Sequence, residues 1–252
     1  MSVEFHIVIP ARFHSTRFPG KLLKLIQGIT VIERVYRQAL KANPKTITIA
    51  TDHQAIFDMA RGFGANTVMT STHHASGTDR LAEVVERGHF DEQDIIVNVQ
   101  GDEPFIAPAL IAQVAASLRK ANSPVATLCR LVDTLESARN PNVVKVVRDS
   151  QGYALYFSRS LIPFCRDNPD SIREVYRHIG LYAYRAGFLR QVVSWPACQL
   201  ETTEALEQLR ILWNGYPIKV DEACVEPLQD INTPEDLAKA CQYLEQGIYS
   251  QP

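Results

Sequence analysis

The chain of 252 residues lacks several features that would place a protein in a class at once. No apolar run approaches the ~20 residues that a bilayer-spanning helix needs, so we expect no membrane insertion. The first residues, MSVEFHIVIPAR, include an acid and an apolar stretch too short for a signal peptide, so we expect no leader. The formal net charge is only −2. This balance does not favour nucleic acid or an anionic membrane as a partner.

Cysteine is scarce and scattered. The five cysteines form no CxxC pair and are odd in number, which excludes a simple disulfide framework. The pattern predicts reduced, mostly buried thiols in a cytosolic, cytoplasmic protein. A catalytic thiol among them remains a minor alternative. The five are Cys129, Cys165, Cys198, Cys224 and Cys241.

The two best-known phosphate-binding loops are also missing. No G-x-x-x-x-G-K-[ST] segment occurs, and no G-x-G-x-x-G follows the first apolar run. A P-loop nucleotidase and a dinucleotide-dependent dehydrogenase are therefore disfavoured.

The first half of the chain alternates between strand and helix patterns. Continuous apolar or β-branched runs predict strands at 5–10, 45–51, 66–69, 94–100 and 124–132. Helical spacing predicts helices at 31–42, at 53–62 behind a capping box of Thr51 and Gln54, after 80, and at 108–119. This rhythm predicts an α/β fold with a doubly wound, mostly parallel sheet. Ligands of such sheets bind beyond the carboxyl ends of the strands.

The rhythm changes after residue 134, so we predict three parts. A core over 1–134 is followed by a smaller inserted α+β subdomain over 135–220, and 221–252 returns to the core. The insertion holds a predicted hairpin, a strand at 178–185 and helices at 186–193 and 203–213. The last part ends in a helix at 233–247, with Thr233 as its N-cap and Pro234 in its first turn.

The segment ARFHSTRFPGK follows the first predicted strand and gathers unusual charge for a near-neutral protein. Arginine forks bind phosphate oxygens bidentately, and a Pro-Gly turn lets backbone amides face an anion. The loop therefore predicts a triphosphate site, although a solvated loop with incidental charges is the plainer alternative. Its polar members are Arg12, Ser15, Thr16, Arg17 and Lys21.

Two other loops follow predicted strands. In VQGDEP, Asp102 is suited to be a ligand of Mg²⁺ beside a triphosphate. The alternative is that it only caps a turn. In STHHASGTDR, Ser76, Gly77 and Thr78 lead into a helix and can contact a base or phosphate, unless Thr78 is only an N-cap. Arg80 in the first turn opposes the helix dipole, which favours an anion or carbonyl partner. The adjacent His73 and His74 are interpreted as loop surface.

These stretches together resemble the sugar nucleotidyltransferases. PARxxSTRxPGK is the version found in the CMP-Kdo synthetase family, the 3-deoxy-manno-octulosonate cytidylyltransferases. Five further stretches agree in order over almost the whole chain: MTSTHHASGTDRLAEVV, IVNVQGDEPFI, YALYFSRSLIPF, HIGLYAYRAGFL and LEQLRILWNG. The resemblance implies the reaction of CTP with Kdo to give CMP-Kdo and diphosphate, for lipopolysaccharide biosynthesis.

The resemblance also implies roles for single residues. It gives Arg12, Lys21 and Asp102 to catalysis and makes 135–220 a sugar-binding and dimerisation part. Nucleotide binding is implied for Ala11, Arg12, Ser15, Arg17, Lys21, Ser76, Gly77, Thr78 and Arg80. Sugar binding is implied for Gln100, Arg159, His178, Tyr182, Glu207 and Gln208. As neighbours on a predicted helix, Glu207 and Gln208 diverge by ~100° and need not share a ligand contact.

One position departs from the family pattern. The family usually has VDTPEDL where this chain has INTPEDL, so Asn232 stands in place of the second implied Mg²⁺ ligand, beside Asp102. Asp230 lies two residues earlier and could substitute for it. The same chemistry on 8-amino-Kdo or a sialic acid is an alternative. A non-catalytic nucleotide-sugar binding protein is another, which Asn232 favours. A homodimer in the cytoplasm of a Gram-negative bacterium is implied by the resemblance alone.

Overall fold

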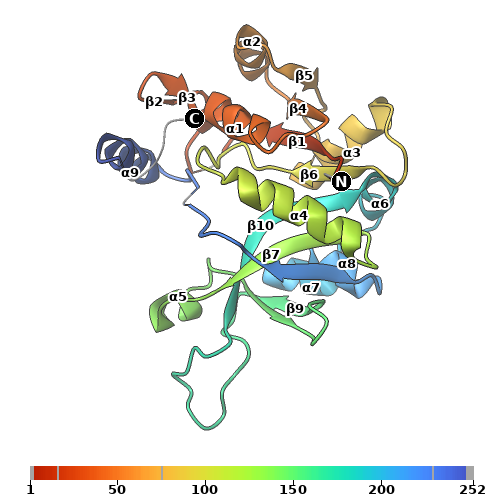
Figure 1. Ribbon diagram of the computed structural model, residues 1–252, viewed down its shortest axis with the longest axis vertical. Coiled ribbons are helices and arrows are strands. Elements are labelled where there is room, and N and C mark those ends of the chain that lie inside the picture. The colour runs from red at the N-terminus through yellow and green to blue at the C-terminus, as the bar shows by residue number, and fades with distance from the viewer. Residues whose placement is uncertain (1–2, 16, 75, 229, 248–252) are drawn as a thin grey trace.

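The computed structural model describes residues 3–15, 17–74, 76–228 and 230–247, so Thr16 of the basic loop lies outside the described residues. Nine of the described strands form one sheet (Figure 1). Its main path runs in the order β11-β7-β10-β6-β1-β4-β5, and β8 and β9 extend it from β10. The strands are β1 (His6–Ala11), β4 (Thr46–Thr51), β5 (Asn66–Met69), β6 (Ile95–Asn98), β7 (Val125–Leu131), β8 (Lys145–Arg148), β9 (Ala154–Ser158), β10 (Tyr176–Arg185) and β11 (Ile218–Glu222).

Most neighbouring strands in the main path are parallel. β1 pairs in parallel with β4 and β6, β4 with β5, and β7 with β11. β10 is the antiparallel member, inserted between β6 and β7. The predicted α/β, doubly wound and mostly parallel class is confirmed. β10 belongs to the central sheet although its residues fall within 135–220, so the division into three parts stays a prediction.

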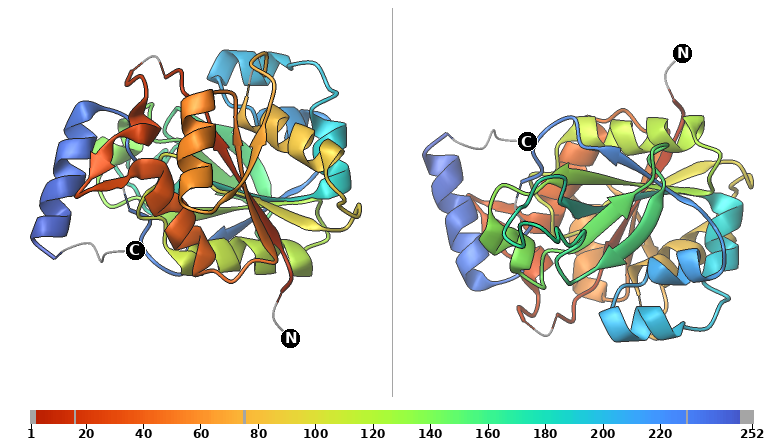
Figure 2. Two further views of the ribbon diagram at one scale, coloured as in Figure 1. Left: turned by 90° about the horizontal axis from the view of Figure 1, so that it is seen from above. Right: turned by 90° about the horizontal axis from the view of Figure 1, so that it is seen from below.

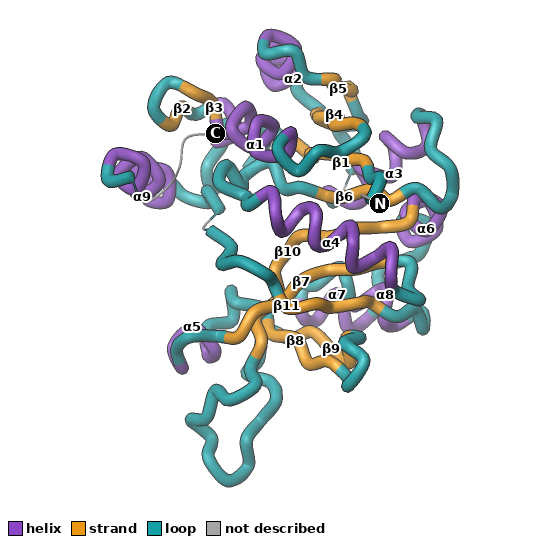
Figure 3. Tube along the Cα trace, viewed as in Figure 1, coloured by secondary structure: helices purple, strands orange, loops and turns teal. Residues whose placement is uncertain are grey.

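Helices cover both faces of the sheet, as Figure 2 shows from above and below. Figure 3 separates them by colour from the strands and from the long loop between β9 and β10. The helices are α1 (Val31–Leu40), α2 (Gln54–Gly62), α3 (Gly77–Arg87), α4 (Pro108–Lys120), α5 (Leu135–Arg139), α6 (Ala186–Val192), α7 (Gln199–Glu204), α8 (Leu209–Trp213) and α9 (Pro234–Glu245). A 3-10 helix (Lys21–Leu23) and a small ribbon of β2 (Leu25–Ile26) and β3 (Ile29–Thr30) follow the basic loop.

The sheet separates two hydrophobic cores. Side chains alternate across a strand, so Ile7 and Ile9 of β1 join the core under α1 and α4, and Val8 joins the core under α3 and α6. Every residue of β1 is buried, because both faces of the strand are covered. This packing holds the carboxyl end of β1 in the middle of the molecule.

Two local predictions were wrong. β4 continues through Thr51, so His53 rather than Thr51 is the N-cap of α2, its ring nitrogen accepting from the Ala55 amide at 3.2 Å. The helix predicted at 203–213 is two short helices, α7 and α8. Ala205 breaks it in the left-handed region, with φ of 49°. Residues 205–208 are therefore not helical.

The C-terminal helix agrees with its prediction, because Thr233 caps α9 and forms a capping box with Asp236. None of the described helices is long and apolar enough to cross a membrane. All five cysteines are free, but only Cys129 and Cys198 are buried, so the expectation of mostly buried thiols was wrong.

Candidate functional site

The site begins where β1 and β6 end side by side. The loop after β6 passes directly over the end of β1, and a Cβ on Gly101 would lie 2.8 Å from the Pro10 carbonyl oxygen. Only glycine permits this approach. The Ile231 amide donates to the Asp102 carbonyl at 2.8 Å, which brings the segment before α9 to the same place.

A cavity of about 530 Å³ opens at this junction. We call it the large cavity. It unites the basic loop, the loop after β6 and the start of α3, as the strand order predicted. Its lining residues are Pro10, Arg12, His14, Ser15, Arg17, Lys21, Leu22, Ser76, Gly77, Gln100, Gly101 and Asp102.

Two cations of the large cavity, Lys21 and Arg17, are hydrogen-bonded to oxygen atoms of the protein. The Lys21 ammonium donates to Asp102 Oδ2 at 2.5 Å and to the Ile231 carbonyl at 2.8 Å. Asn232 Oδ1 accepts from Arg17 at 2.9 Å and from Lys21 at 3.3 Å. The structure thus brings the sequence-predicted phosphate and metal residues into one hydrogen-bonded group.

Arg12 differs from these two cations. One terminal nitrogen of its guanidinium is buried and has no hydrogen-bond partner among the described residues. An unpaired buried donor on a cation costs free energy that an anionic ligand would recover. Arg12 is therefore a strong anion-binding group in the large cavity.

Two further carboxylates lie close to Asp102, although they do not line the large cavity. The pKa of Glu103 is raised to about 8, mainly by burial and also by the nearby charges of Asp102 and Asp230. Burial and Asp102 also raise the pKa of Asp230, whose carboxylate accepts from the Asn232 amide. The described residues include no cluster of three or more His, Cys, Asp or Glu arranged to hold a metal by themselves. Asp102, Glu103 and Asp230 nevertheless form an oxygen-rich group that a divalent cation would stabilise.

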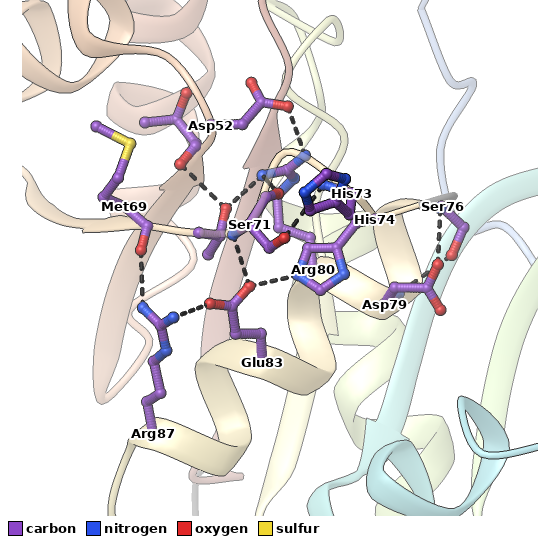
Figure 4. Close-up of polar contacts among 12 residues, drawn as sticks. Asp52, Met69, Ser71, His73, His74, Ser76, Asp79, Arg80, Glu83 and Arg87 are labelled. Atoms are coloured by element: carbon purple, nitrogen blue, oxygen red, sulfur yellow. Dashed lines mark hydrogen bonds and ion pairs between the residues drawn. The ribbon is translucent and has the colours of Figure 1, made fainter.

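The start of α3 forms the third wall. Ser76, not Thr78, is the N-cap, and it forms a capping box with Asp79 (Figure 4). The Ser76 hydroxyl also donates to Glu207 Oε1 at 3.1 Å. The N-terminus of this helix, at Ser76 and Gly77, lines the large cavity, where its amides favour an anion.

Arg80 does not line the large cavity. Its guanidinium is fully buried and donates to Asp52 Oδ2 at 2.7 Å, and it also contacts Thr70 (Figure 4). Burial lowers the pKa of Arg80, and the Asp52 charge opposes that shift. The predicted outside anion partner of Arg80 is thus an internal carboxylate, and its role toward the nucleotide stays a prediction.

Asp52 connects this buried pair to the basic loop. Its Oδ1 accepts from the Phe13 amide at 3.5 Å, and the Phe13 ring stacks on His53 at 3.8 Å between centroids. The pair therefore supports, from behind, the loop that carries Arg12.

The sequence suggested that His74 is plain loop surface, but in the structure its side chain has a specific partner. Its Nε2 contacts the Glu83 carboxylate, which also accepts from the Ser71 amide at 2.9 Å and pairs with Arg87 (Figure 4). This cluster fixes the loop that leads to Ser76.

A second, smaller hollow of about 80 Å³ adjoins the large one, and Gln100 lines both. We call it the small cavity. Glu207 and Gln208, in the turn between α7 and α8, both line it. Its lining residues are Thr78, Asn98, Gln100, Tyr182, Tyr184, Val192, Glu207, Gln208 and Ile211.

The remaining predicted sugar residues lie outside that lining. His178 packs against the Tyr182 ring at 5.3 Å between centroids and shares a 3.0 Å hydrogen bond with Thr127. Burial lowers the pKa of His178 to about 3. Arg159 donates to the carbonyls of Glu204, Pro141 and Ala205, and so joins β9 to the end of α7. Ala11, which the resemblance assigned to nucleotide binding, is the buried last residue of β1.

Sequence reasoning missed three residues of this region. Asn98 is a polar residue inside the otherwise apolar strand β6, which is a signal that could have found it. Asp52 stands at the carboxyl end of β4, where an acid in a parallel sheet points to a site. Tyr184 carries no such signal, because it reads as an ordinary core aromatic.

Comparison with known proteins agrees with this geometry. Residues 6–224 match the family described as cytidylyltransferase. The chain belongs to the cytidylyltransferase family.

Members of this family include close relatives of the chain. It is 64% identical over 243 residues to the 3-deoxy-manno-octulosonate cytidylyltransferase of Legionella pneumophila (strain Corby), covering 96% of this chain and 97% of the relative. It is 47% identical over 246 residues to the protein of the same name from Haemophilus influenzae (strain Rd), covering 94% and 97%.

Solved cytidylyltransferase structures share the fold. A CMP:2-keto-3-deoxy-manno-octonic acid synthetase complexed with CTP superposes with a TM-score of 0.89 and 37% identity, over 97% of this chain and 99% of the other. A 4-diphosphocytidyl-2C-methyl-D-erythritol synthase from Anaerococcus prevotii matches with a TM-score of 0.62 and 16% identity, over 96% and 99%, which shows the fold alone.

Proposed function

We propose that this cytidylyltransferase activates Kdo, converting CTP and Kdo to CMP-Kdo and diphosphate. The observation that carries the proposal is the large cavity. There Arg12, beside Arg17 and Lys21, offers a buried guanidinium nitrogen that has no hydrogen-bond partner among the described residues. The naming of relatives up to 64% identical over nearly the full chain supports Kdo as the acceptor.

The chain's own residues suit an in-line transfer. The anomeric hydroxyl oxygen of the sugar attacks the α-phosphorus and loses its proton to solvent. The bond between the α-phosphorus and the oxygen that bridges to the β-phosphorus breaks, and diphosphate leaves with that oxygen. Arg12, Arg17 and Lys21 would bind the phosphates and neutralise the leaving diphosphate, and the start of α3 would contribute backbone amides. Catalysis of this kind rests on positioning and electrostatics rather than on a protein nucleophile.

Magnesium is part of the proposal. Asp102 would hold the ion, with Asn232 and Asp230 beside it, because carboxylate and amide oxygens are the kind of ligand that Mg²⁺ takes. A bound Mg²⁺ would supply positive charge to the substrate phosphates. In this geometry Lys21 shields Asp102, so Lys21 would turn toward the phosphates when both ligands bind.

The decisive experiment measures diphosphate release from CTP, with and without Kdo, across a Mg²⁺ titration. Release that depends on both Kdo and metal supports the proposal. Parallel assays with 8-amino-Kdo and a sialic acid test the alternative acceptors. CTP binding without release from any acceptor would instead identify a nucleotide-sugar binding protein, the alternative that Asn232 favours.

Asp102→Asn tests the metal role separately. We expect turnover to fall by about 10²-fold or more, the scale of one lost electrostatic contact at the reacting group. The Mg²⁺ concentration for half-maximal activity should rise at the same time. Kinetics like those of the unmodified enzyme would remove Asp102 from the metal site.

The resemblance to the family also implies a cellular setting. We propose a homodimer in the cytoplasm of a Gram-negative bacterium, supplying CMP-Kdo for lipopolysaccharide. Two large apolar side chains support self-association, since Leu155 is 63% exposed and Phe164 69%. Analytical ultracentrifugation of the chain and of a Leu155→Ser, Phe164→Ser variant would test the dimer.

A further inference from the structure

The small cavity contains polar atoms that the protein leaves unsatisfied. Asn98 is only 3% exposed, and its side-chain Oδ1 has no hydrogen-bond partner among the described residues. The Tyr182 hydroxyl, on a residue 8% exposed, approaches Thr127 without completing a hydrogen bond. Buried polar groups are nearly always paired, so two adjacent exceptions require an explanation.

These two residues are brought together by the sheet. Asn98 ends β6 and lies directly opposite Tyr182 of β10 in the antiparallel ladder. Directly opposed residues carry their side chains on the same face of the sheet. Both residues line the small cavity, so two buried polar side chains whose hydrogen-bonding capacity the described residues leave unused meet at one hollow.

The chemistry of this lining selects a class of ligand. The described lining residues include neither lysine nor arginine, and Glu207 adds a carboxylate whose pKa is raised by burial. The neighbouring His178 is neutral, because its pKa is lowered to about 3. An anionic group has no partner here. A hydroxyl has several, because amide, phenol and carboxyl groups can each donate to or accept from it.

We propose that Asn98 is a specificity-determining residue that hydrogen-bonds a hydroxyl of the acceptor's polyol chain in the small cavity. This rests on the proposed function and deepens it. The sugar carboxylate then lies on the other side of Gln100, toward Arg12 and Lys21 in the large cavity. The acceptor is thus selected by a hydroxyl at one end and by its charge at the other.

Asn98→Leu tests the proposal with a change of similar volume. We expect kcat/KM for Kdo to fall by about 10- to 100-fold, the range for a buried hydroxyl that loses its partner, with the affinity for CTP unchanged. The melting temperature should stay equal or rise, because the variant removes an unsatisfied buried atom. A merely structural asparagine would give the opposite, a lower melting temperature with an unchanged KM for Kdo.

Two further variants serve as controls for Asn98→Leu. Asn98→Ser keeps a hydrogen-bonding group, so it should recover part of the lost kcat/KM. Asn66→Leu is the matched control, since Asn66 on β5 is exposed and already bonded to Thr48 at 2.9 Å. It should leave the KM values for both substrates unchanged.

Kdo analogues that each lack one hydroxyl, at C4, C5, C7 or C8, locate the contact. For one of them, the unmodified enzyme should lose about 10- to 100-fold in kcat/KM, whereas Asn98→Leu loses less than about 3-fold. Equal losses in both enzymes for every analogue would overturn the proposal. So would an Asn98→Leu effect that disappears only with the C1 methyl ester, because that places the carboxylate in the small cavity. If the unmodified enzyme releases no diphosphate with Kdo itself, the proposed function fails first.

Discussion

The large and small cavities meet at Gln100 yet are built on opposite plans. The large cavity takes its three cations from a single loop of ten residues, 12–21, and is open and strongly charged. The small cavity draws its lining from α3, β6, β10, α6 and the segment around α8, and has no basic side chain among its described lining residues. The cations of the large cavity therefore come from one short segment, whereas the polar groups of the small cavity come from several distant ones.

This difference separates two tasks. A triphosphate is recognised by concentrated positive charge, which a short loop can supply wherever a strand delivers it. A particular sugar is recognised by hydroxyl positions, which require fixed donors and acceptors from distant parts of the chain. We therefore expect variants of the two cavities to affect different substrates.

The largest effect should come from the large cavity. Lys21→Met removes the cation that contacts Asp102 and Asn232, and we expect kcat/KM for CTP to fall by about 10³-fold. Diphosphate release kinetics measure this. Lys24→Met is the matched control, because Lys24 is exposed nearby and does not line the cavity. A fall of less than about 3-fold for Lys21→Met would show that the lysine does not act on the phosphates.

The next effect concerns the support behind the basic loop. Asp52→Asn leaves the fully buried Arg80 without its carboxylate, so we expect the free energy of unfolding to fall by about 3 kcal/mol. Urea denaturation measures it. Arg139→Ala, which breaks an exposed pair with Asp170, is the contrast and should cost less than about 1 kcal/mol. Equal losses of unfolding free energy in the two variants would mean that the buried pair of Asp52 and Arg80 stabilises the fold no more than an exposed pair does.

The same contrast explains what the sequence could predict. The strands of the first half, the mostly parallel sheet and the basic loop follow from local patterns: apolar runs, helical spacing and clustered charge. The fate of Arg80 did not, because Asp52 lies 28 positions earlier in the chain and only the fold brings the two together. Likewise, Arg159 carries the right charge for an acid sugar, yet its guanidinium is used by three backbone carbonyls.

The small cavity was predictable only in part. Tyr182, Glu207 and Gln208 were expected from resemblance, but the periodicity predicted one continuous helix where the structure breaks it at Ala205, just before Glu207 and Gln208. Asn98 was visible as a polar residue in an apolar strand. Its significance depends on the fold, which places Asn98 opposite Tyr182 and leaves its side-chain oxygen without a hydrogen-bond partner among the described residues.

A smaller effect should come from Tyr182→Phe. The change removes a hydroxyl without a hydrogen-bond partner among the described residues, so stability should hold while kcat/KM for Kdo falls by about 10-fold. Tyr36→Phe, which alters a ring packed on Phe63 away from both cavities, should leave the kinetics unchanged. A destabilised Tyr182→Phe protein with normal kinetics would assign the hydroxyl to folding instead.

The smallest effect is a pH dependence at His178. Its pKa in the folded protein is lowered to about 3, well below the ordinary value of 6.5 that the unfolded chain regains. As pH falls below 6.5, only the unfolded state gains the proton, and the folded state loses roughly 1–2 kcal/mol by pH 5. His178→Gln should flatten this decline in urea titrations between pH 8 and pH 5. Parallel curves for the two proteins would show that another group causes it.

The most direct test of the division between the cavities is a matrix of four KM values, for CTP and for Kdo, in Lys21→Met and Tyr182→Phe. We predict that Tyr182→Phe raises KM for Kdo alone, whereas Lys21→Met raises KM for CTP by more than it raises KM for Kdo. Both KM values rising together in each variant would contradict the account, because the two cavities would then act as one undivided site.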